Sequence, residues 1–401
     1  MIGTEDTRDL IDTCVHCGFC LPACPTYQLW GEEMDSPRGR IHLMSLLEEG
    51  EIEMEAAAPH IDRCLGCLAC VTACPSGVRY DTLIERTRVR RREDAPTGLR
   101  DRLLDRGVFA LFPHPRRLRA VSWPLALGIR PSRLAPRVTF ADMRAKPDPV
   151  TAARGRRRMS VALLQGCVQR VFFGRVNRAS AEALARRGCE VVVPGSQGCC
   201  GALALHAGRE VEARKRALAT MAALRGHDRV VVTAAGCGSA MKEYGELLGT
   251  EEARRFSASV RDVTELLAEL GPSVPEVPDP NGTSRRVVYQ DACHLRHAQG
   301  VRDQPRELLR AVPGLELVEI EGADTCCGSA GIYNLTQPEA ARELGRRKAQ
   351  AILDARPDVV ATANPGCMLQ LRAGVEKHGH GQRVSHVVEI LDEAYSAAQK
   401  S

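Results

Sequence analysis

Two cysteine runs of identical spacing dominate the first part of this 401-residue chain. Both follow the pattern C-x2-C-x2-C-x3-C-P, which is the spacing of cysteines that hold cubane iron–sulfur clusters. Three thiolates two residues apart can each reach a different iron of one cube, while the fourth, followed by proline, ligates the other cluster of a pair. The spacing therefore predicts two [4Fe–4S] clusters. The ligands would be Cys14, Cys17, Cys20 and Cys74 for one cluster, and Cys64, Cys67, Cys70 and Cys24 for the other.

Zinc is the alternative for these runs, because CxxC pairs often bind it. A zinc site needs only four ligands and no third cysteine in each run. The third cysteine and the terminal proline therefore favour iron–sulfur clusters over zinc. A zinc scaffold that assembles a larger complex is retained as the non-redox hypothesis.

Composition limits the class of protein. Seventeen cysteines would suggest disulfides in a secreted chain, but residues 1–10 have no apolar core of a signal peptide. No apolar run approaches the length of a membrane span, so no transmembrane segment is expected. The net charge of +5 is small, and aromatic residues make up 4% of the chain, so nucleic-acid binding is not expected. We expect a cytoplasmic, reduced protein whose cysteines bind metal.

Eight further cysteines form two matching sets separated by 126 to 130 residues. The first set is Cys167, Cys199, Cys200 and Cys237, and the second is Cys293, Cys326, Cys327 and Cys367. Each cysteine follows a short, valine-rich run, which indicates an internal duplication built from strands and helices. In such parallel sheets ligands gather beyond the carboxyl ends of the strands. Either set, or both, could hold a further cluster, bind zinc or supply redox thiols. A lone buried cysteine is more often a small hydrophobe, which is our interpretation of Cys189.

The fold class follows as an α+β multidomain protein. Ser36 and Pro37 suit the start of a helix, and apolar residues follow at helical spacing, so we expect a mainly helical domain around the two clusters. The two duplicated parts are each expected to be α/β, with a parallel sheet. The predicted divisions are a two-cluster ferredoxin-type domain at 1–95, a Pro/Arg-rich connector at 96–158, a first repeat at 159–270, a link at 271–284 and a second repeat at 285–395.

Charged and titratable residues near these motifs have two interpretations each. Arg38 and Arg40 could offset the charge of a thiolate-ligated cluster, or could belong to a solvated helix start. The basic run at 86–92 indicates a solvated helix face or a docking surface for a partner or membrane. The histidines His206, His294 and His297 could be ligands, proton carriers or structural residues.

Four short motifs of this chain resemble those of a known family. They are Val15-His16-Cys17-Gly18-Phe19-Cys20, Pro37-Arg38-Gly39-Arg40-Ile41, Gly166-Cys167-Val168-Gln169 and Cys326-Cys327-Gly328-Ser329-Ala330-Gly331. Over the whole chain these motifs are similar to those of the iron–sulfur subunits of bacterial glycolate oxidase. That family belongs to a superfamily of proteins with CCG cysteine-rich repeats, which includes heterodisulfide reductase subunits.

The resemblance implies an electron-transfer subunit of a glycolate (2-hydroxy acid) oxidase or dehydrogenase, an oxidoreductase acting on CH–OH donors. Flavin-binding partner subunits would carry FAD and the hydroxy-acid chemistry, and electrons would pass towards quinone or another membrane acceptor. The implied location is cytoplasmic, with peripheral contact at the inner face of the plasma membrane. The chain has no G-x-G-x-x-G fingerprint after a strand, and we expect no catalytic residue of its own for the donor.

One difference from the superfamily motif concerns the two matching sets of four cysteines. Ala240 and Gln370 stand where the longer heterodisulfide reductase motif has its last cysteine. A five-cysteine noncubane cluster is therefore not expected, and a four-cysteine cluster or a metal-free repeat stays open. The alternative functions are a thiol–disulfide reductase of the heterodisulfide reductase type, and the iron–sulfur subunit of a lactate or glycerol-3-phosphate dehydrogenase.

Overall fold

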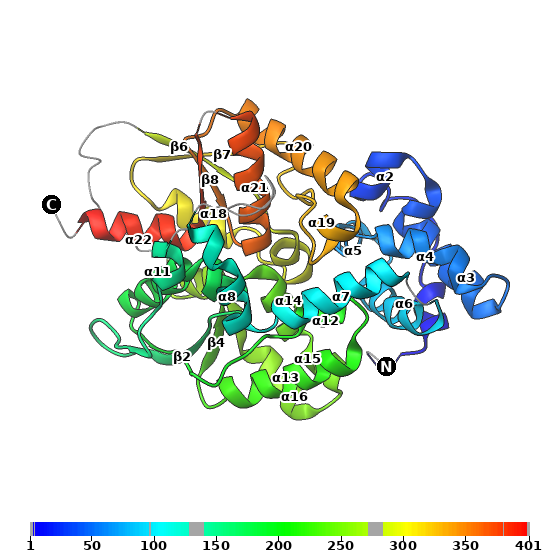
Figure 1. The fold of residues 1–401 in the computed structure, drawn as a ribbon. Coiled ribbons are helices and arrows are strands. Elements are labelled where there is room, and N and C mark those ends of the chain that lie inside the picture. The colour runs from blue at the N-terminus through cyan, green and yellow to red at the C-terminus, as the bar shows by residue number, and fades with distance from the viewer. Residues whose placement is uncertain are drawn as a thin grey trace.

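The computed structural model describes residues 3, 5–95, 98–127, 140–271, 284–379 and 381–398 (Figure 1). Most of the predicted link at 271–284 and part of the connector at 96–158 lie outside these residues. The described chain confirms the predicted fold class, with a helical N-terminal domain followed by two α/β halves. Among the described residues, no helix combines the length and the apolar character that crossing a bilayer requires.

In its described residues the N-terminal domain contains helices, turns and bends but no strand. It comprises α1 (Thr7–Asp12), α2 (Pro25–Trp30), the short 3-10 helix Glu33–Asp35, α3 (Pro37–Glu49), α4 (Met54–Arg63), α5 (Ala69–Ala73) and α6 (Tyr80–Asp94). The helix predicted after Ser36 is α3, because the Ser36 hydroxyl accepts a hydrogen bond of 3.0 Å from the Gly39 amide and caps its first turn. Its apolar face, with Ile41 and Met44, is buried against α4 and α6.

The connector has more regular structure than its prolines suggested. It forms α7 (Leu99–Leu111), α8 (Pro115–Ala126), α9 (Phe140–Arg144) and the two-residue strand β1 (Val150–Thr151). Val108 and Phe109 of α7 are buried in the core of the first half, which fixes this helix to the body of the protein. Strand β1 joins the first sheet antiparallel to β3, an edge strand that the sequence did not predict.

The first half is a five-stranded sheet covered by helices. Its strands are β2 (Met159–Leu164), β3 (Cys189–Val192), β4 (Arg229–Val232) and β5 (Val260–Asp262), in the order β1-β3-β2-β4-β5, and all but β1 are parallel. Its helices are α10 (Gln169–Phe172), α11 (Gly174–Arg186), α12 (Ala202–His206), α13 (Glu210–Leu224), α14 (Ala235–Lys242), α15 (Tyr244–Leu248), α16 (Glu251–Ser259) and α17 (Val263–Glu269). The central strands β2 and β4 are mostly apolar and are buried at every residue after the first, as expected for a parallel sheet covered on both faces.

The second half repeats this plan. The strands β6 (Arg285–Tyr289), β7 (Leu315–Val318), β8 (Val359–Thr362) and β9 (Arg383–His386) are all parallel and lie in the order β7-β6-β8-β9. This matches the order β3-β2-β4-β5, so the predicted duplication is confirmed. The helical elements are a π-helical turn at His294–Ala298, then α18 (Gln304–Arg310), α19 (Tyr333–Thr336), α20 (Pro338–Asp354), α21 (Pro365–His378) and α22 (Val387–Ala398).

The two halves share one apolar core. Helices α11 and α22 pack against each other, and side chains of both sheets belong to the same buried cluster. Arg187 donates a hydrogen bond of 2.6 Å to the Tyr395 hydroxyl across this boundary. This packing fixes the carboxyl ends of the strands in one half relative to those in the other half.

Candidate metal centres and a cysteine-lined cleft

The first thiol cavity lies beside the first cysteine run. It has a volume of about 30 Å³ and is lined by the thiols of Cys14, Cys17, Cys20, Cys70 and Cys74. His16 and Gly18 have positive φ angles of 52° and 85°, and these left-handed positions fold the run around the cavity. Arg38 covers the same loop, with its Nη1 donating a hydrogen bond of 3.2 Å to the carbonyl of His16.

The second thiol cavity is smaller, about 20 Å³, and more deeply enclosed. Its thiols are Cys24, Cys64, Cys67 and Cys70, and Arg40 and Tyr80 line it as well. Burial alone would raise the pKa of Cys64, but the charges of Arg40 and Arg88 outweigh it and hold that pKa below its ordinary value. The amide of Gly66 also donates to Cys64 Sγ at 3.4 Å.

Arg40 is the residue whose surroundings differ most from the solvated interpretation. Its side chain is 1% exposed, and it donates to the His60 carbonyl at 2.7 Å and to Thr26 Oγ1 at 3.1 Å. A buried guanidinium needs compensating negative charge, and Asp35 at 3.6 Å supplies one part of it. The Cys64 thiol of the second cavity, whose pKa Arg40 helps to lower, is its other partner. For Arg40 the solvated interpretation is wrong, whereas Arg38 is partly exposed and paired with Glu33.

The thiols surround the two cavities instead of converging on a point. Each cavity combines three thiols of one run with at least one thiol of the other run. Within the described part of the chain, no three His, Cys, Asp or Glu side chains meet closely enough to hold a single metal ion. One zinc ion would need its sulfur ligands about 2.3 Å from a common centre. Thiols spread around a cavity therefore suit a group containing several irons better than they suit zinc.

The second constellation lies where the strands end in both halves. Cys167 follows β2, the pair Cys199–Cys200 follows β3, and Cys237 lies in α14 after β4. In the second half Cys293 follows β6, Cys326–Cys327 follows β7, and Cys367 lies in α21 after β8. The placement at strand ends is thus the same for both sets.

The glycine after each cysteine pair has a structural reason. Gly201 and Gly328 have φ angles of +90° and +85°, a conformation that L side chains rarely adopt. A Cβ on Gly328 would also lie 2.8 Å from the carbonyl oxygen of Ala341, and one on Gly201 would lie 3.1 Å from that of Ala213. In the first half Gly201 leads directly into α12, whereas in the second half α19 begins only at Tyr333.

The thiols within each set interact. Hydrogen bonds from Cys167 and Cys200 lower the pKa of Cys199 well below its ordinary value. Hydrogen bonds from Cys326 and Cys367 do the same for the pKa of Cys327, whose sulfur lies 3.5 Å from that of Cys367. Each set therefore contains at least one thiol poised to ionise, which is the form that binds metal.

Lys348 distinguishes the second set from the first. It is 4% exposed and donates hydrogen bonds to the carbonyls of Gly322 and Ala323, and its charge further lowers the pKa of Cys327. A lone lysine in the amphipathic helix α20 gave no signal in the sequence that it would be buried. The equivalent position in α13 is Thr220, as the matching contacts of Gly201 and Gly328 with these helices show.

All eight cysteines of the two sets line one cleft between the halves, with a volume of about 990 Å³. Its other walls are mostly apolar and come from α7, α8, α12, α19 and α21. Hydrogen bonds join the two halves near the cleft, from Gln299 Nε2 to the Ala235 carbonyl at 2.9 Å and from the Gly236 amide to Asn364 Oδ1 at 3.4 Å, and the last two residues line it. The duplication therefore places two sets of thiols around a single open space.

The second thiol cavity of the N-terminal domain adjoins the second set. Leu65 and Cys67 pack in one buried cluster with Cys326, Tyr333 and Leu344. The Tyr333 hydroxyl donates a hydrogen bond of 3.0 Å to the Arg63 carbonyl across this contact. Thiols of the two constellations thus belong to the same apolar contact between domains.

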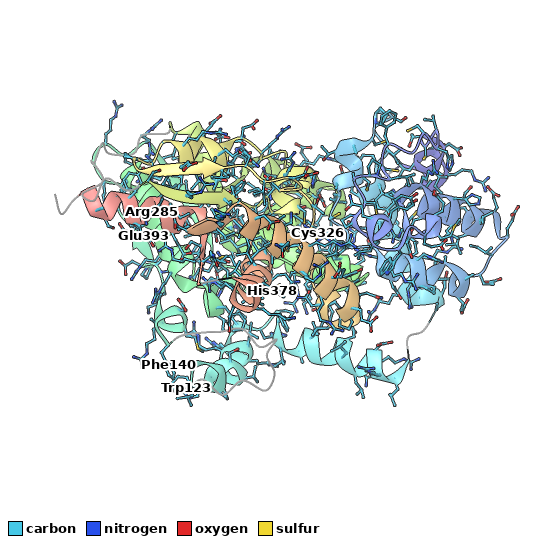
Figure 2. All side chains as sticks on the ribbon, turned by 90° about the horizontal axis from the view of Figure 1, so that it is seen from above. Trp123, Phe140, Arg285, Cys326, His378 and Glu393 are labelled. Carbon is cyan, nitrogen blue, oxygen red and sulfur yellow. The ribbon has the colours of Figure 1, made fainter. Side chains whose placement is uncertain are left out.

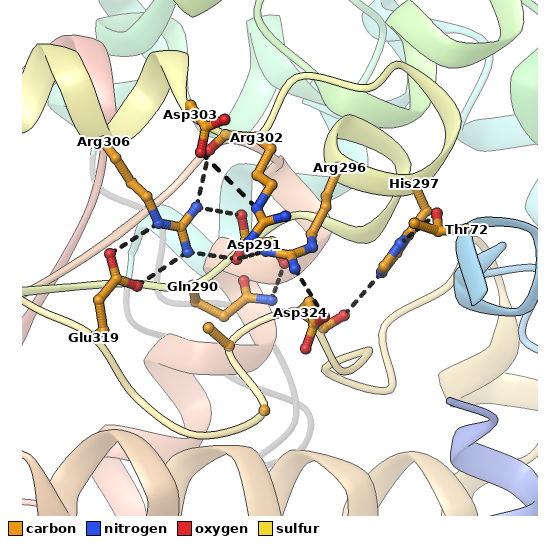
Figure 3. Close-up of polar contacts among 12 residues, drawn as sticks. Thr72, Gln290, Asp291, Arg296, His297, Arg302, Asp303, Arg306, Glu319 and Asp324 are labelled. Atoms are coloured by element: carbon orange, nitrogen blue, oxygen red, sulfur yellow. Dashed lines mark hydrogen bonds and ion pairs between the residues drawn. The ribbon is translucent and has the colours of Figure 1, made fainter. Parts of the chain in front are cut away.

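Polar contacts support this junction at one side (Figure 3). His297 hydrogen bonds to Thr72 through Nδ1 at 3.0 Å and to the Asp324 carbonyl through Nε2 at 3.3 Å. Behind it Arg306 forms ion pairs with Asp291 at 2.8 Å and with Glu319 at 2.9 Å. His297 therefore has a structural position between the domains.

The other two histidines lie in the cleft. His294 Nδ1 is 3.5 Å from Cys293 Sγ, and its ring centroid lies 5.1 Å from that of His206. His206 Nδ1 contacts Glu85 at 3.3 Å, and burial lowers the pKa of His206 to about 3. Burial also raises the pKa of Glu85 to about 8. Sequence reasoning missed Glu85, because one acid in a charged helix gives no sign that it will be buried.

The arginines of the basic run at 86–92 form hydrogen bonds and ion pairs within the chain. Arg88 donates a hydrogen bond of 2.6 Å to the Cys64 carbonyl, beside the second thiol cavity. Arg90, Arg91 and Arg92 form ion pairs of 2.8 Å with carboxylates of α3, α4 and α7. Arg90 also pairs with Asp94 within α6 at 3.1 Å. The run therefore holds α6 in the domain.

Two family models match the chain. The model described as "4Fe-4S dicluster domain" covers residues 10–78, and the one described as "Cysteine-rich domain" matches twice, at 161–242 and 287–372. These ranges contain the two cysteine runs and the two sets at the strand ends.

Curated relatives match most of the chain. The "Glycolate oxidase iron-sulfur subunit" of Escherichia coli (strain K12) is 34% identical over 97% of this chain and 95% of its own length. The "Probable glycolate oxidase iron-sulfur subunit" of Bacillus subtilis (strain 168) is 35% identical over the same shares. "Lactate utilization protein A" of Geobacillus kaustophilus is 31% identical over 58% of this chain and 99% of its own length.

Proposed function

We infer that this chain, which belongs to the family of glycolate oxidase iron–sulfur subunits, carries electrons from a flavin-bearing partner subunit towards a membrane acceptor. The observation that supports the proposal most directly is that the thiol-lined spaces lie next to one another through the protein. Two cavities in the N-terminal domain are followed, without a break in the packing, by the cysteines of the second half and the cleft.

The proposed ligand sets follow the cavities. Cys14, Cys17 and Cys20 with Cys74 would hold one [4Fe–4S] cluster. Cys64, Cys67 and Cys70 with Cys24 would hold the other. When bound, such clusters accept and release one electron at a time. The chain supplies the thiolates, the buried charge of Arg40 and the Gly66 amide, which favour the ionised ligands.

A further cluster is proposed for Cys293, Cys326, Cys327 and Cys367. Three observations support this set over the first one. Its members pack against Cys67, three of the four are buried, and Lys348 places a positive charge beside them. The first set is assigned to redox-active or structural thiols.

The hydroxy-acid chemistry is assigned to the partner. The chain has no dinucleotide fingerprint, so FAD and the donor site would lie on flavin-binding subunits. Glycolate is the proposed donor, on the strength of the two relatives that match nearly the whole chain. Lactate is the competing donor, since lactate utilization proteins match the part of the chain that they cover. The proposed acceptor is quinone, met at the inner face of the plasma membrane.

The decisive experiment measures iron and acid-labile sulfide per chain, with EPR spectra, on anaerobically purified protein. About eight irons would support the two cubane clusters alone, and about twelve would add a cluster on the second set. Stoichiometric zinc with little iron would overturn the proposal. Glycolate- and lactate-driven dye reduction, measured with and without the flavin subunits, tests the donor and the direction of electron flow.

One observation favours a second candidate, a thiol–disulfide reductase. Both cysteine sets face a single cleft of about 990 Å³, which is large enough for a small disulfide. Ala240 and Gln370 at the last motif positions argue against it. Cleavage of a disulfide substrate by the reduced chain, in the absence of flavin subunits, would distinguish this activity from electron relay.

A further inference from the structure

The two helices of the connector have inner faces that belong to the cleft. Leu111 of α7, Phe112 and, from α8, Leu118 and Val121 line it together with the eight cysteines. Leu118 is also buried in the core shared by the halves, so α8 is firmly packed on this side. Helices α7 and α8 therefore form one wall of the thiol-lined space.

The outer faces of the same helices are unusually apolar for exposed surface. Leu99 and Leu103, one turn apart on α7, are 73% and 58% exposed, and on α8 and just after it Trp123 and Leu127 are 50% and 57% exposed. Figure 2 shows Trp123 and Phe140 at one outer edge of the molecule, along which the cyan helices α7 and α8 run. The rings of these two residues pack edge to face at 5.0 Å, which holds the indole in place.

Positive charge accompanies these apolar side chains. Residues 99–127 contain six arginines and two aspartates, a net charge of +4 in a chain whose total is +5. All six arginines are exposed, and Asp105 is already paired with Arg92 and Arg209. Among the described residues, Arg100, Arg106 and Arg116 form no ion pair, so their charges face solvent without a carboxylate partner.

We propose that α7 and α8 are a docking surface for an anionic lipid bilayer. Exposed leucines with arginines on one side of a helix are the composition of elements that lie in the membrane interface. Tryptophan prefers the headgroup level, and each arginine near an anionic surface adds to binding. The apolar side chains would enter the boundary of the acyl chains while the arginines contact lipid phosphates.

Docking at this edge would set the thiol-lined cleft beside the bilayer. Because the inner faces of α7 and α8 line the cleft, a lipophilic acceptor leaving the lipid would meet the cysteines after passing a single layer of helices. This consequence rests on the proposed electron-transfer function. The membrane binding itself does not, because it depends only on the charge and exposure of the two helices.

The test uses the full chain and the fluorescence of Trp123. Trp30 is the only other tryptophan, so a Trp30→Phe background makes Trp123 the sole reporter. Vesicles of phosphatidylcholine with phosphatidylglycerol should shift its emission to the blue, and brominated lipids should quench it. Vesicles of phosphatidylcholine alone should bind at least about 30-fold more weakly, the effect of about two arginine–lipid contacts.

A matched pair of variants separates docking from misfolding. Leu99→Glu with Leu103→Glu on α7 should reduce vesicle cosedimentation by more than about tenfold, because exposed apolar area is replaced by negative charge. Val211→Glu with Leu218→Glu on α13 serves as the control, since these residues are 85% and 56% exposed and lie on a different helix. Circular dichroism should show the native fold in both.

Three results would overturn the proposal. They are an unchanged Trp123 emission on anionic vesicles, equal binding to neutral and anionic vesicles, and equal losses in the α7 and α13 variants. Loss of flavin-subunit copurification in the α7 variant, with no vesicle binding by the parent chain, would assign the surface to the partner instead. Dye reduction by the assembled complex that contains the α7 variant distinguishes the membrane-docking proposal from the electron-transfer proposal. If it persists while vesicle binding is lost, the electron-transfer proposal stands independently of the membrane.

Discussion

The N-terminal domain meets the two halves of the protein through different kinds of contact. With the first half it shares titratable groups, namely the ion pair between Arg79 and Glu246 at 2.7 Å and the pair of Glu85 with His206 at 3.3 Å. With the second half it shares a buried cluster of apolar side chains and cysteines, which holds Cys67 and Cys326 and has hydrogen bonds but no ion pair across it among the described residues. Figure 2 places Cys326 on the side of the second half that faces the blue N-terminal helices.

This difference shows what a duplication conserves and what it leaves free. The strand order, the cysteine pairs and the glycines after them are common to both halves, because they follow from one sheet geometry. The surroundings of the thiols are not common. Among the residues that the structure describes, only the second set has a buried lysine beside it and a thiol of the N-terminal domain packed against it. Within one framework, these differences in environment are what support the proposed role of the second set in electron transfer.

The largest expected effect comes from equivalent cysteines of the two sets. We expect Cys327→Ser to remove about four irons per chain and to lower glycolate-driven acceptor reduction by about 100-fold or more. Cys200→Ser, the same position in the first half, should leave both nearly unchanged. Iron analysis and dye reduction by the complex provide the measurement, and equal losses in the two variants would contradict the asymmetry.

The titratable contact with the first half should make stability depend on pH. The pKa of Glu85 is raised to about 8, so the folded state binds a proton that the unfolded state has released. The contribution of Glu85 is complete below about pH 4 and is lost as pH rises to about 8, an effect on the order of 5 kcal/mol. Because burial lowers the pKa of His206 to about 3, its contribution runs in the opposite direction up to about pH 6.5, so the net loss of stability is expected between about pH 6.5 and 8. Glu85→Gln should remove the part of this loss that Glu85 causes and raise stability at pH 8, while Glu243, whose pKa is also raised by burial, keeps its own part. Thermal unfolding across that range tests it, and a profile as steep as that of the parent would refute the role of Glu85.

Lys348 should influence the second set alone. Lys348→Met leaves the Gly322 and Ala323 carbonyls without this donor, which should destabilise the chain by about 2 kcal/mol. It should also raise the pKa of Cys327 in the metal-free protein, since a nearby positive charge is removed. Urea unfolding and alkylation rates against pH report the two effects. Thr220→Val is the matched change in the first half and should leave the reactivity of Cys327 as it is.

The smallest effect is expected from the exposed ion pair. The side chains of Arg79 and Glu246 are 38% and 46% exposed, so solvent screens their attraction. Arg79→Gln should cost about 0.5 kcal/mol or less in the free energy of unfolding, and salt should reduce the difference further. A loss as large as that of Lys348→Met would mean that the first half is held as tightly as the second.

The sequence predicted the parts of the molecule that depend on local spacing. The helix after Ser36, the parallel strands and their duplication are confirmed. Each was predicted from a helix cap, a valine-rich run or a repeated motif, which are patterns formed by residues close together in the sequence. The sequence also predicted that the cysteines of the two sets follow strands. It did not reveal that both sets line one cleft, since that depends on how the halves pack.

The residues that the sequence missed are those whose burial depends on distant elements. Glu85 and Lys348 were missed, and for Arg40 the sequence left two interpretations open, because each lies in a helix with many charged neighbours, where a solvated position is the default expectation. Only the approach of another domain or a cysteine loop buries them. In the same way the prolines of the connector concealed β1, which is stabilised by β3 and not by its own two residues.

Strand β1 also affects how the protein resists aggregation. An edge strand presents unpaired amide and carbonyl groups that can recruit a strand of another chain. On the first sheet β1 covers β3, is only two residues long and is followed by four arginines between residues 154 and 158. Among the described residues β7 has no such cover, but its Glu316 pairs with Arg286 at 3.0 Å and places charge on that edge. One half thus protects its sheet with a strand from the connector, and the other does so with charge.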